Sequence, residues 1–90
     1  MPEIIITIKN KVGLHARPAG LFVREAGHYK SNILAICGEN KANAKSILAV
    51  LTLGANQGSQ ITIRADGEDA EAALQALAAL NESNYGEAEK

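Results

Sequence analysis

Cysteine, aromatic residues and long apolar runs are scarce in this 90-residue sequence. Cys37 is the only cysteine, so no disulfide can form within the chain, and we expect a reducing compartment. The aromatic residues Phe22, Tyr29 and Tyr85 are too few to provide a stacking platform for single-stranded nucleic acid. The longest apolar run near the N-terminus covers residues 4–6, which is too short for a signal peptide or a membrane span. We therefore expect a cytoplasmic protein that does not act in a membrane.

Net charge is also small. Nine lysines and arginines stand against ten aspartates and glutamates, which leaves a formal charge of −1 and no reason to expect nucleic acid or an anionic membrane as a partner. Apolar residues make up 47% and charged residues 21% of the chain, as in folded globular proteins. We expect a single domain over residues 1–90, in which the polar segment from about 82 to 90 forms a loose tail.

The periodicity of apolar residues predicts strands and helices in the order βαββαβα. Strands are expected at residues 3–9, 32–37, 41–44 and 60–65, and helices at residues 16–27, 46–54 and 70–80. In the last strand, apolar and polar residues alternate strictly, which is typical of an antiparallel sheet with one solvated face. The predicted fold class is therefore α+β, an open-faced β-sandwich in which three helices cover one face of a four-stranded antiparallel sheet.

The second predicted strand leaves open which of its faces is buried. Ile33, Ala35 and Cys37 share one side, whereas Leu34 and Ile36 share the other and are the more apolar set. The pattern alone does not assign either side to the core.

The heptapeptide at residues 13–19, GLHARPA, places a histidine, an arginine and a proline at a helix start. Pro18 suits the first turn, where its missing N–H is not needed, so His15 is expected at or next to the N-cap. A helix N-terminus offers unpaired N–H donors and the positive end of the dipole, and both bind anions. Arg17 adds a planar cationic fork that matches phosphate oxygens.

This position also suits a phosphoryl acceptor. The positive field favours the neutral form of the His15 imidazole, which starts from a pKa of about 6.5 and can then act as a nucleophile. The spacing alone equally fits a plainer interpretation, in which His15 is a capping or surface residue and Arg17 is solvated.

Ser46 is a second side chain at a predicted helix start that could accept a phosphoryl group. A phosphoryl group on Ser46 would lie at the positive end of the following helix. Serine there can equally serve only as an N-cap, which contributes about 1 kcal/mol. The helix itself is apolar almost all round, so either it is buried on every side or some of Ile47, Leu48 and Leu51 face solvent as a docking surface.

A metal centre or a hydrolase is poorly supported. His15 and His28 stand thirteen residues apart across the first helix, roughly 20 Å, and no cysteine or carboxylate cluster completes a site. No second base lies near His15 in the sequence, and there is no glycine-rich nucleotide loop. We expect no cofactor and no metal, and a carrier that presents His15 to other enzymes rather than an enzyme.

Taken together, these motifs resemble the HPr family, the phosphocarriers of the bacterial phosphoenolpyruvate-dependent sugar phosphotransferase system. Residues 13–19 resemble its histidine signature and residues 43–54 its serine-site signature. Residues 61–63 and 66–67 resemble its last strand and the start of its last helix. The resemblance covers nearly the whole chain.

The resemblance implies that His15 accepts a phosphoryl group on a ring nitrogen from phosphorylated enzyme I and passes it to a histidine of an enzyme IIA component. Arg17 and the backbone of Ala16 and Arg17 would hold the phosphate. Ser46 would be the regulatory site of an HPr kinase/phosphorylase. Its phosphorylated form would slow phosphotransfer and can act as corepressor for a catabolite-control transcription regulator.

The resemblance further implies docking through the first two helices. The implied docking surface comprises Leu21, Arg24, Ile47, Leu48 and Leu51. Leu48 and Leu51 stand where methionines are frequent, so volume is kept and the adaptability of methionine is lost. Gly20 replaces a usual threonine, which loosens the first helix slightly.

Two further expectations follow from the same resemblance. The protein is expected to be a monomer that associates weakly through the open sheet face, where Leu34 and Ile36 are more apolar than usual. The alternative function is a mainly regulatory phosphoprotein, either a catabolite-control corepressor or a module of a parallel phosphorelay, without a role in sugar transport. His15 and Arg17 favour the carrier, whereas Ser46 keeps the alternative open.

Overall fold

In the computed structural model, residues 2–9, 13–14, 16–83 and 85 are described. They form seven elements in the predicted order βαββαβα. The elements are β1 (Glu3–Thr7), α1 (Ala16–Ala26), β2 (Asn32–Cys37), β3 (Asn40–Asn43), α2 (Ile47–Leu51), β4 (Gln60–Asp66) and α3 (Ala70–Glu82).

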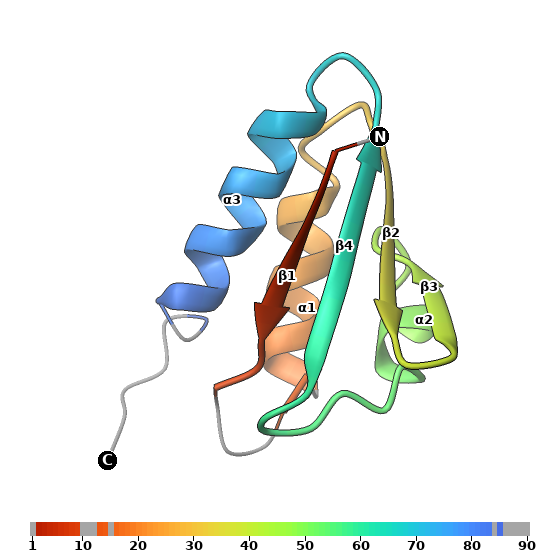
Figure 1. Ribbon diagram of the computed structural model, residues 1–90, viewed down its shortest axis with the longest axis vertical. Coiled ribbons are helices and arrows are strands. Elements are labelled where there is room, and N and C mark those ends of the chain that lie inside the picture. The colour runs from red at the N-terminus through yellow and green to blue at the C-terminus, as the bar shows by residue number, and fades with distance from the viewer. Residues whose placement is uncertain (1, 10–12, 15, 84, 86–90) are drawn as a thin grey trace.

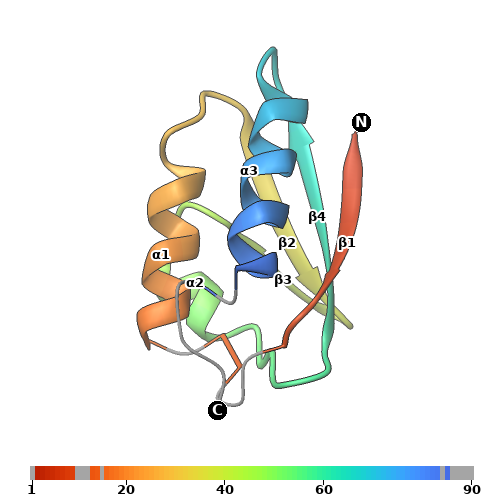
Figure 2. The same ribbon diagram turned by 90° about the vertical axis from the view of Figure 1, so that its left-hand side faces the viewer.

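The four strands form one antiparallel sheet in the order β1-β4-β2-β3 (Figure 1). In the view of Figure 2, the three helices lie together on one side of the strands. The other side of the sheet carries no helix among the residues that the structure describes. The α+β open-faced sandwich predicted from the sequence is therefore confirmed.

The core lies between the helices and the inner face of the sheet. Phe22 of α1, Val50 of α2 and Leu77 of α3 are each fully buried there. The inner face of the sheet is formed by Ile6, Ile33, Ala35, Ala42, Ile61, Ile63 and Ala65. Burying this much apolar surface is the main favourable term in folding.

Pairing with β4 assigns the faces of β2. Ile33 lies opposite Ala65, and Ala35 lies opposite Ile63. Residues directly opposite one another point to the same face, so the small, less apolar side of β2 is buried. Leu34 and Ile36, the more apolar pair, lie on the outer face and are half-buried.

Several predicted boundaries shift. The first strand ends at Thr7 rather than at residue 9, the third covers residues 40–43 rather than 41–44, and the second helix has only the five residues Ile47–Leu51. The segment predicted to form a loose tail from about residue 82 is packed where it is described, because α3 continues to Glu82 and the side chain of Tyr85 is buried, as is that of Asn81 just before it. Residues 86–90 lie outside the described part of the chain.

Asn81 has a specific partner at the edge of the sheet. The amide N–H of Ala65 donates to the Pro2 carbonyl and that of Ile8 donates to the Ser59 carbonyl. Main-chain groups of even-numbered residues in β1 thus face β4, and those of odd-numbered residues point outward. Asn81 Nδ2 donates to the outward carbonyl of Thr7 at 2.9 Å.

A carboxylate ties the start of α3 to the loop between α1 and β2. Asp69 accepts hydrogen bonds from the Ser31 hydroxyl at 2.5 Å, the Lys30 N–H at 2.8 Å and the Ser31 N–H at 2.9 Å. These donors, the Ser31 hydroxyl above all, lower the pKa of Asp69 from 3.8 to about 2. The only local signal that Asp69 carries in the sequence is a negative charge at the start of α3, because its partners lie 38 and 39 residues away.

We expect Asp69→Asn to destabilise the protein at neutral pH but not at pH 2. Because the folded-state pKa is depressed, the carboxylate contributes stability at pH values above 3.8, and this contribution is lost as the pH falls from 3.8 to about 2. Urea unfolding of wild type and variant should give midpoints that differ at pH 7 and converge near pH 2. The neighbouring exposed Glu68 provides the control, since Glu68→Gln should leave the midpoint at pH 7 unchanged. Equal midpoints for Asp69→Asn and wild type at pH 7 would contradict the expectation.

Candidate functional site

The histidine signature, residues 13–19, leads directly into α1. The helix begins at Ala16, as predicted, and Arg17 is exposed while Pro18 and Ala19 are buried. His15 lies outside the described residues, and so does the side chain of Ala16.

The residues before His15 are anchored firmly. Leu14 is 3% exposed, and its N–H donates to the Ala55 carbonyl at 3.0 Å. Gly13 has a φ of +71°, and a Cβ placed on it would lie 2.8 Å from Asn56 Cα. The segment before the helix is therefore held against the loop that follows α2. The sequence signal for this anchor was the apolar Leu14 between a glycine and a histidine.

The first turn of α1 can receive an anion. The N–H groups at a helix start have no partner within the helix, and no acidic residue stands in the first turn of α1. Arg17 adds a cationic side chain that is exposed to solvent. An incoming phosphate at this turn would therefore meet positive charge and N–H donors.

Ser46 is the N-cap of α2, as predicted. Its Oγ accepts a hydrogen bond from the Ala49 N–H at 3.3 Å. The turn before it is shaped by Asn43, whose side-chain oxygen accepts from the Lys45 N–H at 2.9 Å. The ammonium group of Lys45 donates to the Tyr29 carbonyl at 2.7 Å, which ties this turn to the segment after α1. Asn43 is a typical turn residue, but the contact of Lys45 has no local signal in the sequence.

Two substitutions of Ser46 have predictable effects on stability. Ser46→Ala removes the cap and should lower the free energy of unfolding by about 1 kcal/mol. Ser46→Asp keeps an acceptor at the N-cap and adds negative charge at the positive end of the helix, so its stability should stay close to that of wild type. Urea unfolding of the three proteins checks this, and an aspartate variant no more stable than the alanine variant would contradict it.

Large apolar side chains of α2 face solvent. Leu48 is 74% exposed, Leu51 40% and Ile47 39%, whereas Val50 is fully buried. Of the two alternatives that the sequence left open for this apolar helix, the structure shows the second, in which part of it faces solvent. The helix α2 packs against α1, and in Figure 2 it lies beside the first turns of α1.

Two predicted docking residues come from α1. Arg24 is exposed, whereas Leu21 is half-buried and packs against the core. The structure thus brings α1 and the exposed side chains of α2 to neighbouring positions on the helical side of the molecule. Exposed large apolar side chains gathered on one side of a molecule are typical of a protein-docking surface.

The described residues hold no group of three metal-ligating side chains. His28 is exposed after the end of α1, and its Nδ1 lies 3.7 Å from the Glu25 carboxylate. None of the described helices has the length and apolar content needed to span a bilayer.

Comparison with known proteins gives the family. Residues 2–83 match the family model described as the PTS HPr component phosphorylation site. The chain belongs to the HPr family. Members of this family are phosphocarrier proteins and not catalytic enzymes, so the chain is an HPr-type carrier of the phosphotransferase system.

Relatives and solved structures agree with this assignment. The chain is 46% identical over 77 residues to the phosphocarrier protein HPr of Mycoplasma capricolum subsp. capricolum, which covers 86% of each chain. It is 42% identical over 74 residues to the HPr-like protein Crh of Bacillus subtilis, covering 82% of this chain and 87% of the relative. The crystal structure of HPr-C-His from Thermoanaerobacter tengcongensis superposes with a TM-score of 0.95 at 47% identity, covering 99% of this chain and 100% of that one.

Proposed function

We propose that this protein carries a phosphoryl group on His15 from phosphorylated enzyme I to an enzyme IIA component of sugar uptake, in the cytoplasm. The observation that carries the proposal is the histidine signature at residues 13–19, which leads into α1 in a chain of the HPr family. The buried Leu14 and the exposed Arg17 on either side of His15 support it.

The transfer is a displacement at phosphorus. A ring nitrogen of His15 attacks the phosphoryl group on the enzyme I histidine, so a new P–N bond forms at His15 as the P–N bond of enzyme I breaks. The N–H groups of Ala16 and Arg17 and the Arg17 guanidinium would hold the phosphoryl oxygens. The second transfer, to the enzyme IIA histidine, repeats the step with the roles exchanged.

The docking surface for both partners would be the helical side of the molecule. Leu21, Arg24, Ile47, Leu48 and Leu51 would form it, next to the start of α1. Exposed apolar side chains next to the start of α1 suit a carrier that must fit more than one enzyme.

Mass spectrometry tests the proposal directly. The protein is mixed with phosphoenolpyruvate and a catalytic amount of a bacterial enzyme I, and we expect a mass gain of one phosphoryl group that is lost in acid. Acid lability distinguishes a phosphoramidate on histidine from an acid-stable ester on serine. An unchanged mass, or a gain that survives acid, would overturn the proposal.

Arg17→Ala should slow this phosphorylation by roughly 10- to 100-fold. The variant removes a charge-assisted hydrogen bond to the phosphoryl group, which contributes about 1.5–3 kcal/mol. Arg64→Ala is the matched control, because Arg64 lies in β4 on the opposite side of the molecule, and its rate should equal that of wild type. Equal rates for Arg17→Ala and wild type would remove Arg17 from the proposed phosphate site.

We propose a second, regulatory function at Ser46. A half-buried N-cap hydroxyl beside the exposed Leu48 supports it, as does the similarity to the HPr-like protein Crh. A phosphoryl group on Ser46 would place negative charge in the middle of the docking surface and weaken binding of enzyme I. Incubation with ATP and an HPr kinase/phosphorylase should give an acid-stable mass gain in wild type and none in Ser46→Ala; no gain in wild type would exclude this function.

A further inference from the structure

The outer face of the sheet is partly apolar and carries no helix among the described residues. Two rows of side chains cross it, each with one residue from every strand. The first row is Glu3, Arg64, Leu34 and Asn43. The second row is Ile5, Thr62, Ile36 and Lys41. Ile5 is 63% exposed, which is unusual for an isoleucine in a sheet.

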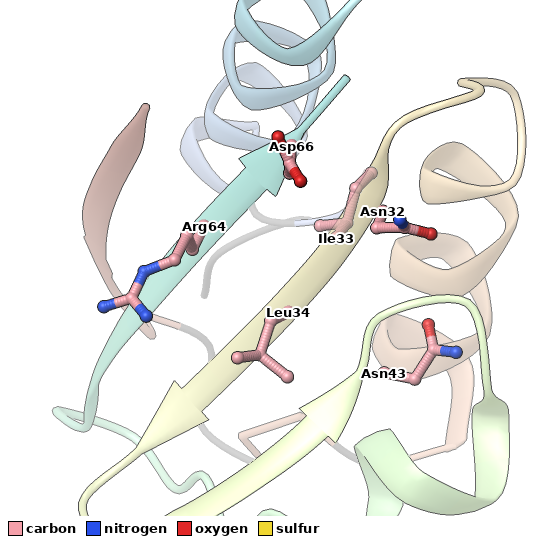
Figure 3. A pocket seen from close by; sticks show the side chains of 6 residues that line it. All are labelled: Asn32, Ile33, Leu34, Asn43, Arg64 and Asp66. Carbon is pink, nitrogen blue, oxygen red and sulfur yellow. The ribbon is translucent and has the colours of Figure 1, made fainter. Parts of the chain in front are cut away.

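A shallow hollow lies on this face, but its polar groups do not converge on one point. It has a volume of about 370 Å³ and is lined by Asn32, Ile33, Leu34, Asn43, Arg64 and Asp66. Figure 3 shows Leu34 standing over the sheet between Arg64 and Asn43, with the Arg64 side chain extending away from Asp66. Arg64 Nε instead donates to Glu3 Oε1 at 3.1 Å. A small ligand would find few polar partners here, whereas a second broad surface would cover the apolar side chains.

Charge is distributed across this face in a self-complementary way. Glu3 lies on β1 and Lys41 on β3, which are the two opposite edges of the sheet. A two-fold axis parallel to the strands lays β1 of one copy over β3 of the other. The long side chain of Lys41 in one copy can then reach the carboxylate of Glu3 in the other copy, which lies in the neighbouring row. This contact occurs once at each edge, and between the edges Thr62 of one copy faces Ile36 of the other.

We propose that the outer face of the sheet binds a second copy of this chain about such an axis. Two twisted sheets pack face to face with their strands within about 30° of each other and about 10 Å apart, which this axis allows. The contact is isologous, because the same patch serves both copies. Thr62 and Ile36 of the inner strands form its centre, and Ile5 lies toward each edge. The charged residues at the two edges set its orientation.

The proposed association leaves the helical side of both copies free. Both α1 and α2 lie on the other face of the sheet, so the start of α1 and the exposed Leu48 point away from the contact. Two docking surfaces then face in opposite directions on one dimer. A variant can therefore lose self-association and still accept a phosphoryl group, or the reverse.

Sedimentation velocity over a wide range of protein concentration is the first test. We expect the weight-average sedimentation coefficient of wild type to rise with concentration, and Ile5→Lys to abolish that rise. Leu48→Lys is the matched control, because it places the same charge at an exposed apolar position on the helical side, and it should leave the rise intact. A wild type that remains monomeric at the highest concentration would overturn the proposal, as would association that is lost in Leu48→Lys but kept in Ile5→Lys.

Charge reversal tests the axis. Glu3→Lys alone sets two lysines together across the contact, and Lys41→Glu alone sets two glutamates together, so each variant should associate less than wild type. An equimolar mixture should associate more than either variant alone, because opposite charges then meet at both edges of the mixed dimer. A mixture that associates no more than the separate variants would overturn the proposed orientation.

Discussion

An alanine at position 15 is expected to leave the protein unable to accept a phosphoryl group from phosphorylated enzyme I. The proposed P–N bond needs a nucleophilic ring nitrogen next to a cationic site, and only His15 stands directly before the exposed Arg17 and the first turn of α1. The acid-labile mass gain should therefore disappear entirely. Circular dichroism and urea unfolding of the same variant show that the acceptor, and not the fold, has been lost.

His28→Ala is the matched control for this experiment. His28 is the second histidine of the chain and is exposed, but it follows the C-terminal end of α1, about 16 Å along the helix from its start. The Glu25 carboxylate lies 3.7 Å from its Nδ1 and would repel an incoming phosphoryl group. We expect the full mass gain in His28→Ala. If the mass gain were lost in His28→Ala and kept in His15→Ala, the acceptor would be His28 and our proposal would be wrong.

The second large effect is expected at Gly13, the first residue of the histidine signature. Gly13→Ala should lower the free energy of unfolding by about 2–5 kcal/mol, because it combines a positive φ with overpacking. The backbone φ is +71°, and the added Cβ would press against the Ala55 carbonyl and lie 2.8 Å from Asn56 Cα. These are backbone atoms and cannot turn aside as a flexible side chain would.

The Gly13→Ala substitution should also affect the proposed phosphorylation site. The carbonyl of Ala55 accepts the Leu14 N–H, so a methyl group at position 13 displaces the anchor that precedes His15. Phosphorylation by enzyme I should be slower even where the variant remains folded. Urea unfolding and the initial phosphorylation rate measure the two effects separately.

Gly20→Ala is the matched control, because the same added methyl group is expected to stabilise the protein at this position. Gly20 lies inside α1, and nothing lies within 4 Å of a Cβ added there. Alanine should therefore raise the free energy of unfolding by about 0.5–1 kcal/mol through better helix propensity. Destabilisation at both positions would mean that the close approach at Gly13 is not what matters.

Local patterns in the sequence were enough to predict the helices and strands. Strict alternation from Gln60 to Ala65 and helical spacing from Ala70 to Leu80 each reflect one buried face, so order, type and most boundaries of the elements could be derived. The N-cap role of Ser46 followed from the same reasoning, whereas the apolar pattern of α2 left open whether Leu48 is buried or exposed. The acceptor role of His15, by contrast, stays a prediction.

What the sequence could not supply depends on contacts between distant segments. The faces of β2 were undecided because they depend on the register with β4. Ile33 and Ala35 lie opposite the buried residues Ala65 and Ile63, whereas the more apolar Leu34 and Ile36 lie opposite Arg64 and Thr62 on the outer face. The sequence indicates only a negative charge at a helix start for Asp69, whereas in the structure its carboxylate accepts hydrogen bonds from the loop before β2. Burial of Asn81 went unrecognised because its partner, Thr7, lies 74 residues away.

The amide of Asn81 also bears on how the chain behaves when crowded. Three consecutive isoleucines at residues 4–6 form an edge strand without proline, which is the composition of segments that nucleate fibrils. Nucleation at an edge needs a run of outward main-chain groups that a second chain can copy. Because Asn81 occupies the Thr7 carbonyl, only Glu3 and Ile5 remain on the described β1 to serve as a template, far fewer than the roughly six or seven residues of a fibril-forming segment. The chain can thus keep an isoleucine-rich edge strand without polymerising along it.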